Sequence, residues 1–186
     1  MLVCLVGLPG SGKTTIGRHL ARRLGVSFVD TDHVIEERIG CSIREFFERE
    51  GEDRFRDIET EVIEDLTLSH EGVLSSGGGA VLRPINRQAL RRGRVFYLRA
   101  TPDELMRRLR HDTQRPLLQV ADPLARLRDL FAKRDPLYTE AAHHVIETSR
   151  PSVSGLVQAV LDKLGAGDTQ NHRSRYPARP RSDRSQ

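Results

Sequence analysis

The chain has 186 residues, with 30 basic and 26 acidic side chains and a formal net charge of +4. Its length is that of one domain with a sizeable core, and no apolar run approaches the length of a membrane span. Five arginines and two aspartates after residue 165 account for most of the net charge, so residues 1–165 are nearly neutral. We therefore expect no nucleic-acid partner and no membrane partner.

The two cysteines lie in unlike settings. Cys4 falls within an apolar strand pattern and Cys41 between two helical patterns, which favours free thiols over a disulfide framework. The chain also shows no basic and apolar leader ahead of the motif that starts at residue 7. We expect a cytoplasmic protein.

A phosphate-binding motif follows the first expected strand, Leu2–Val6. Residues 7–14 read GLPGSGKT, which matches G-x-x-x-x-G-K-[ST], and a helical stripe then continues to Gly25. Glycines let backbone N–H groups surround a phosphate, and the helix directs its positive end at it. In this motif Lys13 reaches the β- and γ-phosphates and the Thr14 hydroxyl contacts Mg²⁺. The chain is therefore predicted to bind a nucleoside triphosphate.

Two aspartates follow the second expected strand, Ser27–Val29. In an extended segment alternate residues share a face, so Asp30 and Asp32 are expected to point into the same pocket. One carboxylate would support the Mg²⁺ shell, and the other would accept a proton from a substrate hydroxyl. The alternative is that Asp30 or Thr31 only caps the helix expected over Val34–Ile39.

Two further helices precede the third expected strand. A Ser42–Glu45 capping box opens one over Ile43–Glu50, and a charged amphipathic pattern predicts another over Asp53–His70. The third strand, Val73–Ser75, is followed by three glycines at 77–79. Bare backbone at this point favours close approach to a ligand, and a flexible turn is the alternative.

The second half of the chain continues the alternation of strands and helices. The expected elements are a helix from Pro84 to about Arg92, a strand Val95–Leu98, a helix from Pro102 to about Arg110, a helix from Pro123 to Arg134, a strand His144–Ile146 and a helix Ser152–Leu164. Residues 111–116 lack an apolar pattern, which fits a lid or a plain surface loop. Such alternation predicts a parallel sheet covered on both faces, with ligands beyond the carboxyl ends of its strands.

These motifs together resemble those of shikimate kinase over residues 1–165. The segments that carry the resemblance stand in the family's order: GLPGSGKTT at 7–15, DTD at 30–32, FRDIE at 55–59, GGGAV at 77–81, RPLL at 115–118 and KRDPLY at 133–138. The resemblance implies an α/β, three-layer P-loop kinase fold, with a five-stranded parallel sheet of order 2-3-1-4-5 and helices on both faces. The kinase domain would span residues 1–165, with a mobile lid over about 111–121. Residues 166–186 lie outside the resemblance; their lack of apolar periodicity predicts a disordered basic tail.

The resemblance also implies the reaction. The γ-phosphoryl group of ATP would pass to the 3-hydroxyl of shikimate with Mg²⁺ as cofactor, and we expect a monomer. The residues it implies as catalytic are Lys13, Asp32 and Arg115. Asp30 would support the metal with Thr14, while Asp32 would bind substrate hydroxyls and act as the base.

The remaining implied roles concern the two substrates. Shikimate would be bound by Asp32, by the glycines Gly77, Gly78 and Gly79, and by Arg56 and Arg134, which would grip its carboxylate. The nucleotide would contact Gly10, Ser11, Gly12, Lys13, Thr14, Thr15, Arg110, Arg115 and Pro116, with Arg115 closing over the phosphates from the lid.

Several of these side chains also fit purely structural roles. Arg56 fits an i,i+4 pair with Glu52 on a solvated helix face, and Arg134 fits a cation that complements a helix C-terminus. Asp135 would weaken the hold of Arg134 on a carboxylate if it faced the pocket. Tyr97 and Tyr138 are expected only to pack.

Two rival functions remain. One is another small-molecule kinase, acting on gluconate or on a nucleotide. The other is an ATP-dependent regulatory module that binds nucleic acid through the basic tail.

Overall fold

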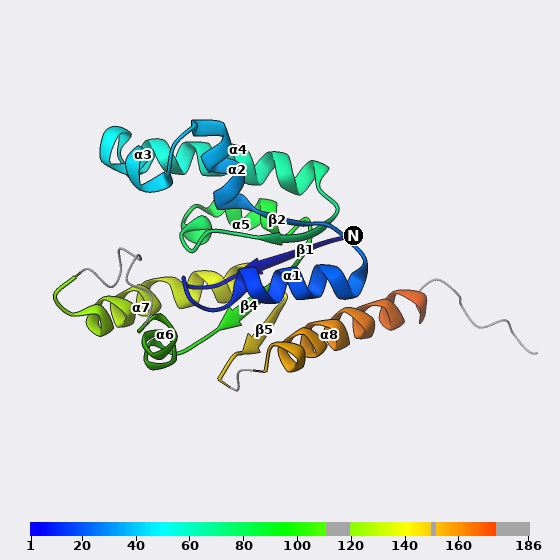
Figure 1. The fold of residues 1–186 in the computed structure, drawn as a ribbon. Helices are drawn as coiled ribbons and strands as arrows, with labels where there is room; N and C mark the ends of the chain where they lie inside the picture. Colours follow the sequence, from blue (N-terminus) through cyan, green and yellow to red (C-terminus); the bar gives the residue numbers. More distant parts are fainter. Residues whose placement is uncertain (111–119, 150–151, 174–186) are drawn as a thin grey trace, which may run out of the picture.

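The computed structural model describes residues 1–110, 120–149 and 152–173, with side chains up to residue 165. Its strands form a parallel sheet in the order β2-β3-β1-β4-β5, which confirms the predicted fold class and strand order (Figure 1). The strands are β1 (Leu2–Val6), β2 (Phe28–Asp30), β3 (Gly72–Ser75), β4 (Arg94–Arg99) and β5 (His144–Glu147). Their carboxyl ends meet at one edge, where ligands bind in sheets of this kind.

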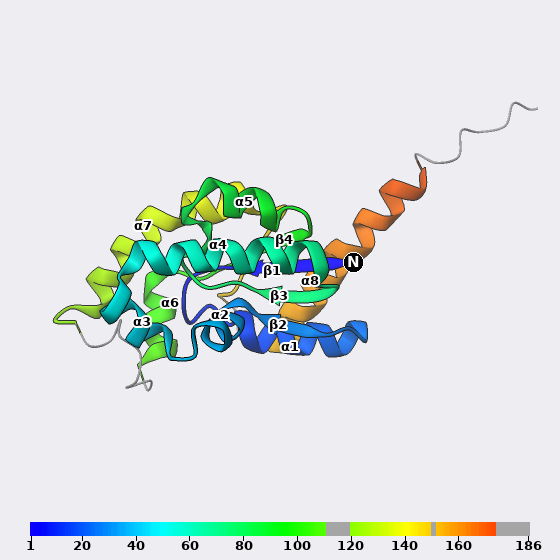
Figure 2. The same ribbon diagram turned by 90° about the horizontal axis from the view of Figure 1, so that it is seen from above.

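Helices cover both faces of the sheet (Figure 2). One face carries α1 (Lys13–Leu24) and α8 (Val153–Arg173), which pack on each other. The other face is covered by α4 (Glu52–Ser69), η1 (Ala80–Leu82), α5 (Pro84–Leu90), α6 (Pro102–Leu109) and α7 (Pro123–Ala141). Two shorter helices, α2 (Thr31–Ile39) and α3 (Ile43–Glu50), pack on α4 around Ile35, Phe46 and Phe55.

The central strand β1 explains why the sheet needs helices on both sides. Its alternate side chains Val3 and Leu5 enter the cluster beneath α1 and α8, while Cys4 and Val6 enter the opposite cluster. All four are fully buried. Burial of apolar side chains on both faces fixes β1 in the middle of the sheet, and with it the loop that follows Val6.

Side-chain caps mark the starts of several helices. Thr101 and Glu104 form a reciprocal capping box at the start of α6, and the Asp122 side chain accepts the backbone N–H of Ala125 at 3.1 Å at the start of α7. At α3 the Ser42 hydroxyl accepts the N–H of Glu45 at 3.1 Å.

The bounds of helices α2 and α7 differ clearly from the predicted ones. Helix α2 begins at Thr31 rather than Val34, because Asp30 caps it directly. Helix α7 does not end at Arg134, as predicted, but continues to Ala141 with Pro136 inside it. An interior proline costs about 3 kcal/mol; here Tyr138 and Ala141, both fully buried beyond the proline, offset that cost by packing on the core.

The last helix also runs further than expected. Helix α8 continues past Gly165, its predicted end, to Arg173. A glycine inside a helix costs only about 1 kcal/mol relative to alanine, so it is a weak stop signal. The predicted lid lies outside the described residues at 111–119, and so do residues 174–186 of the predicted tail. Among the described helices, none is long and apolar enough to cross a membrane.

Candidate active site

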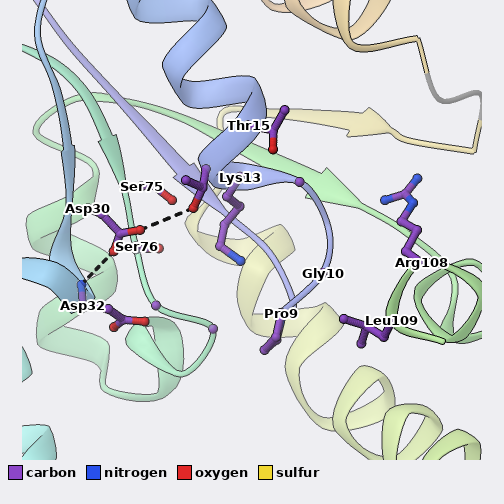
Figure 3. Close-up of a pocket in the computed structure, with 14 residues that line it drawn as sticks. Pro9, Gly10, Lys13, Thr15, Asp30, Asp32, Ser75, Ser76, Arg108 and Leu109 are labelled. Atoms are coloured by element: carbon purple, nitrogen blue, oxygen red, sulfur yellow. Dashed lines mark hydrogen bonds between the residues drawn. The ribbon is translucent and has the colours of Figure 1, made fainter. Parts of the chain in front are cut away.

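A cavity of about 420 Å³ opens at the carboxyl ends of β1, β2 and β3 (Figure 3). Asp30 and Asp32 lie on one side of it, Arg108 and Leu109 lie across from them, and Lys13 projects between. The lining residues are Pro9, Gly10, Gly12, Lys13, Thr14, Thr15, Asp30, Asp32, Ser75, Ser76, Gly77, Gly78, Arg108 and Leu109. Nine of these fourteen residues are among the site residues expected from the sequence, and the structure brings them together at the expected edge of the sheet.

The phosphate-binding loop forms the floor between β1 and α1. Gly10 and Gly12 adopt φ values of 87° and 95°, a left-handed conformation that favours glycine. The Lys13 ammonium donates to the carbonyl oxygens of Gly7 at 2.7 Å and Leu8 at 3.0 Å. The lysine therefore lies folded along the loop, with its positive charge at the place where phosphates would sit.

Ser11 differs from its neighbours in the loop. Its backbone N–H donates to the carbonyl oxygen of Leu8 at 3.1 Å, and its side chain is buried away from the cavity. The structure therefore places Ser11 within the framework of the loop, whereas Gly10, Gly12, Thr14 and Thr15 line the cavity itself.

The two oxygens of the Asp30 carboxylate accept different hydrogen bonds. Its Oδ1 accepts the backbone N–H of Asp32 at 2.9 Å, which caps α2, and its Oδ2 accepts the Thr14 hydroxyl at 3.4 Å. The capping alternative and the metal-site prediction are therefore compatible. A carboxylate and a hydroxyl oxygen side by side suit Mg²⁺, which takes one or two protein oxygens together with phosphate and water.

Asp32 lies in the first turn of α2 and not in the predicted extended segment. It still lines the cavity with Asp30, because the tight strand-to-helix junction keeps both carboxylates at the same edge. Burial, together with the neighbouring charges of Asp30 and Glu59, raises the pKa of Asp32 to about 6 against the opposing effect of Lys13. Such a carboxylate is ionised at neutral pH and is poised to take a proton.

Two arginines converge on the glycines after β3. The Arg56 guanidinium is only 12% exposed and donates to Glu59 at 2.8 Å and to Glu52 at 3.3 Å. A Cβ built on Gly79 would collide with this guanidinium, and one built on Gly78 would lie 3.4 Å from Nη1 of Arg134. The bare backbone at 78–79 thus lets both positive groups come close to the rim of the cavity.

These contacts bear on the structural alternatives for the two arginines. Arg56 does pair with Glu52, but it is held mainly on the buried side by Glu59 and is not solvated. Arg134 is not a C-terminal cation, since α7 continues for two further turns. Asp135 faces away from Arg134, toward the Tyr97 hydroxyl at 2.7 Å and Nε of Arg99 at 2.9 Å.

Sequence reasoning missed Glu59, which is 1% exposed. Burial raises the pKa of its carboxyl, while Arg56 and then Arg134 act in the opposite direction. Its spacing of three residues from Arg56 on one helix is the signal that could have revealed it. Asp32 and Glu59 both approach Gly77, because a Cβ there would lie 2.6 Å from the first carboxylate and 3.3 Å from the second.

The second missed residue is Arg108, which lines the cavity where the resemblance implied Arg110. Its guanidinium donates to the carbonyl oxygen of Thr148 at 2.5 Å and to that of Ser11 at 3.4 Å. Arg110 is exposed at the end of α6 and does not line the cavity. Arg115 and Pro116 lie outside the described residues.

The fold and this site define a class of protein. A parallel sheet of order 2-3-1-4-5, a phosphate-binding loop after its central strand and a carboxylate beside the cavity are features of P-loop phosphotransferases. Within that class, a family model described as shikimate kinase matches residues 9–165, and the chain belongs to this family.

Individual relatives support the same family assignment. A shikimate kinase of Paracidovorax citrulli is 60% identical over 164 residues, covering 86% of this chain and 90% of that protein. One of Ralstonia nicotianae is 57% identical over 163 residues, covering 87% and 86%. Among solved structures, shikimate kinase from Acinetobacter baumannii in complex with shikimate is 46% identical, with a TM-score of 0.84 over 89% of this chain and 93% of that one.

The comparisons also bear on the rival kinase functions. A gluconokinase from Sinorhizobium meliloti covers 94% of this chain and 97% of its own, but with a TM-score of 0.58 and 16% identity. That likeness shows the shared fold alone.

Proposed function

We propose that Asp32 is the general base of a shikimate kinase reaction in this chain. In the reaction of the family, the oxygen of the shikimate 3-hydroxyl bonds to the γ-phosphorus of ATP, the bond to the ADP oxygen breaks, and the hydroxyl proton leaves. The observation that carries the assignment is the position of Asp32, which lines the cavity with Lys13 and meets Glu59 of the arginine cluster at Gly77. Its carboxylate lies where phosphoryl donor and acceptor would meet.

The donor half of the site is the phosphate-binding loop. Backbone N–H groups of the loop and the N-terminus of α1 favour the negative charge of the phosphates. We assign Lys13 to the β- and γ-phosphates, which requires its ammonium to exchange the carbonyl oxygens of Gly7 and Leu8 for phosphate oxygens. Arg108 lines the far wall of the same cavity and replaces Arg110 in our assignment. Arg115 keeps its proposed role over the phosphates.

Thr14 and Asp30 would hold Mg²⁺, directly or through water. When bound, the ion neutralises charge on the β- and γ-phosphates. No cluster of three or more His, Cys, Asp or Glu side chains suited to a metal occurs among the described residues. The hydroxyl–carboxylate pair is therefore our candidate for the metal.

The acceptor half is formed by Arg56, Arg134 and the glycines at 77–79. A guanidinium group donates two parallel hydrogen bonds to a carboxylate, which suits recognition of a planar acid. Glu59 accepts from Arg56 at 2.8 Å and holds its guanidinium beside Gly79. Two cations beside bare backbone fit a small polyhydroxy acid better than an uncharged sugar.

We also propose a cytoplasmic location and a monomeric state. Cys4 and Cys41 are free thiols, which supports a reducing compartment. The donor and acceptor groups described above all come from one chain.

Coupled ADP release with Mg-ATP tests the function directly. We expect turnover with shikimate and none above background with gluconate, AMP or no acceptor. Lys13→Ala should abolish it, while the matched control Lys133→Ala should not, because Lys133 is exposed on α7 and pairs there with Asp129. Turnover with another acceptor alone would contradict the proposal.

A further inference from the structure

The Tyr138 side chain links helix α7 to the glycine segment of the proposed acceptor site. It lies on α7 one turn after Arg134, it is completely buried, and its hydroxyl donates to the carbonyl oxygen of Gly78 at 2.5 Å. Its ring packs on Tyr97 with centroids 4.9 Å apart. The expectation that Tyr138 only packs is therefore incomplete, because its hydroxyl reaches a residue that is 60 positions away in the sequence.

The glycine segment at 77–79 has no side chains to hold it in place. The backbone N–H of Gly77 donates to the Thr31 hydroxyl at 3.1 Å, and the carbonyl oxygens of Gly77 and Gly79 accept from Ala80 and Leu82, both at 3.1 Å. The last two bonds close local turns that lead into η1. Tyr138 therefore supplies the bond that joins Gly78 to α7.

Arg134 lies at the same junction. Residues four apart share one face of a helix, and the charge of Arg134 lowers the pKa of Tyr138 against the larger effect of burial, which raises it to about 12. The hydroxyl is therefore protonated at neutral pH and able to donate. A Cβ on Gly78 would lie 3.4 Å from Nη1 of Arg134 and 2.8 Å from Cδ of Pro9 in the phosphate loop.

We infer that Tyr138 is a positioning residue for the acceptor. Its hydroxyl fixes Gly78 relative to Arg134, so that the glycine segment and the guanidinium are presented together to the acid, next to the phosphate loop. This inference rests on the proposed acceptor site. Without the hydroxyl, the segment loses its link to α7 and the two halves of the acceptor site can separate.

The test compares Tyr138→Phe with Tyr97→Phe. Tyr97 is a matched control: it is 1% exposed, it stacks on the same ring, and its hydroxyl also makes one hydrogen bond, to Asp135 at 2.7 Å. That bond does not involve the glycine segment, and Asp135 keeps Arg99 as a partner at 2.9 Å. Both variants keep the aromatic ring and lose one buried hydroxyl, so a general loss of stability should affect them similarly.

We expect Tyr138→Phe to raise the KM for shikimate about tenfold, the size of effect typical of one buried hydrogen bond. Its KM for ATP should stay within about twofold, and Tyr97→Phe should leave both constants within about twofold. An unchanged KM for shikimate in Tyr138→Phe would overturn the inference. Equal rises in both variants would overturn it as well, since they would reflect general loosening of the core.

Hydrogen exchange provides a readout that does not depend on turnover. The peptide spanning residues 76–82 should exchange faster in Tyr138→Phe than in the wild type, and at the wild-type rate in Tyr97→Phe. Unchanged exchange in Tyr138→Phe would contradict the anchoring role. If the wild-type protein phosphorylated a different acceptor, the proposed function would fail, while the exchange measurement would still decide whether Tyr138 anchors the segment.

Discussion

The donor and acceptor halves of the site are built in opposite ways. The proposed donor half is centred on one continuous segment, residues 7–15, in which Gly10 and Gly12 adopt left-handed angles and line the cavity. The proposed acceptor half is assembled from α2, α4, the segment after β3 and α7, and it would act through charged side chains. Only tertiary packing brings these four elements together.

This difference predicts how each half responds to change. The phosphate loop depends on backbone conformation and on a single lysine, so substitutions there should affect nucleotide use. The acceptor half depends on the distances between Arg56, Arg134 and the bare backbone at 77–79. Changes there should alter shikimate use while leaving ATP binding intact.

On the acceptor side, the largest expected effect comes from Asp32→Asn. The amide keeps the size of the side chain but cannot take a proton, so kcat should fall by about 10²- to 10⁴-fold. The KM for ATP should stay nearly constant, because Asp32 is not assigned to the nucleotide. Steady-state kinetics with each substrate varied in turn would measure both quantities. A kcat within a few-fold of wild type would show that another group takes the proton.

The substitution Gly79→Ala tests whether the position of Arg56 matters for the acceptor. The new methyl group would collide with the Arg56 guanidinium and displace it, and misplacement of a binding group by about 1 Å can lower kcat/KM about 10²-fold. The loss should appear with shikimate varied and not with ATP varied. Gly155→Ala on α8 is the control, because its Cβ would meet only ordinary contacts at 3.5 Å. Equal losses in the two variants would argue against a specific effect on Arg56.

The pH dependence of turnover follows from Asp32. Its pKa is raised to about 6, so the carboxyl is protonated below that pH and cannot accept a proton. Because this pKa is that of the unliganded site, it governs kcat/KM for shikimate. We expect kcat/KM to be level near pH 7 to 8 and to fall by up to tenfold per pH unit below about pH 6. The residual activity of Asp32→Asn should lack this decline. A wild-type profile that stays level down to about pH 5 would contradict the assignment of Asp32 as the base.

The smallest expected effect is that of deleting residues 166–186. The segment carries five arginines against two aspartates, and the cavity-lining residues all precede it. Turnover should therefore change by less than about tenfold, equivalent to about 1.4 kcal/mol. A larger loss measured with the same assay would revive the view that the basic segment takes part in function.

The phosphate-binding loop could be located from the sequence because its residues form a contiguous motif. Strand, loop and helix follow one another in the chain, so the pattern of residues 2–24 carried nearly all the needed information. The strand order and the place of both aspartates at the cavity were also predicted correctly. The reason given for Asp32 was wrong, however, since it lies in a helical turn and reaches the cavity through the sharp junction after β2.

The acceptor half and the wall of the cavity were harder to predict. Helix α7 passes through Pro136, and only because it does so can Tyr138 reach Gly78. Arg108 rather than Arg110 lines the cavity because Leu105 and Leu109 fix which side of α6 faces inward. Both outcomes depend on packing between elements that are distant in the sequence.

The most direct test of the acceptor site is the preference for a charged acid. We would measure kcat/KM for shikimate and for its neutral carboxamide, in the wild type and in Arg134→Ala. If Arg134 binds the carboxylate, the wild type should prefer shikimate strongly, and Arg134→Ala should reduce that preference by at least about tenfold, or 1.4 kcal/mol. If both proteins show the same preference, Arg134 does not recognise the carboxylate, and the proposed acceptor site would be wrong.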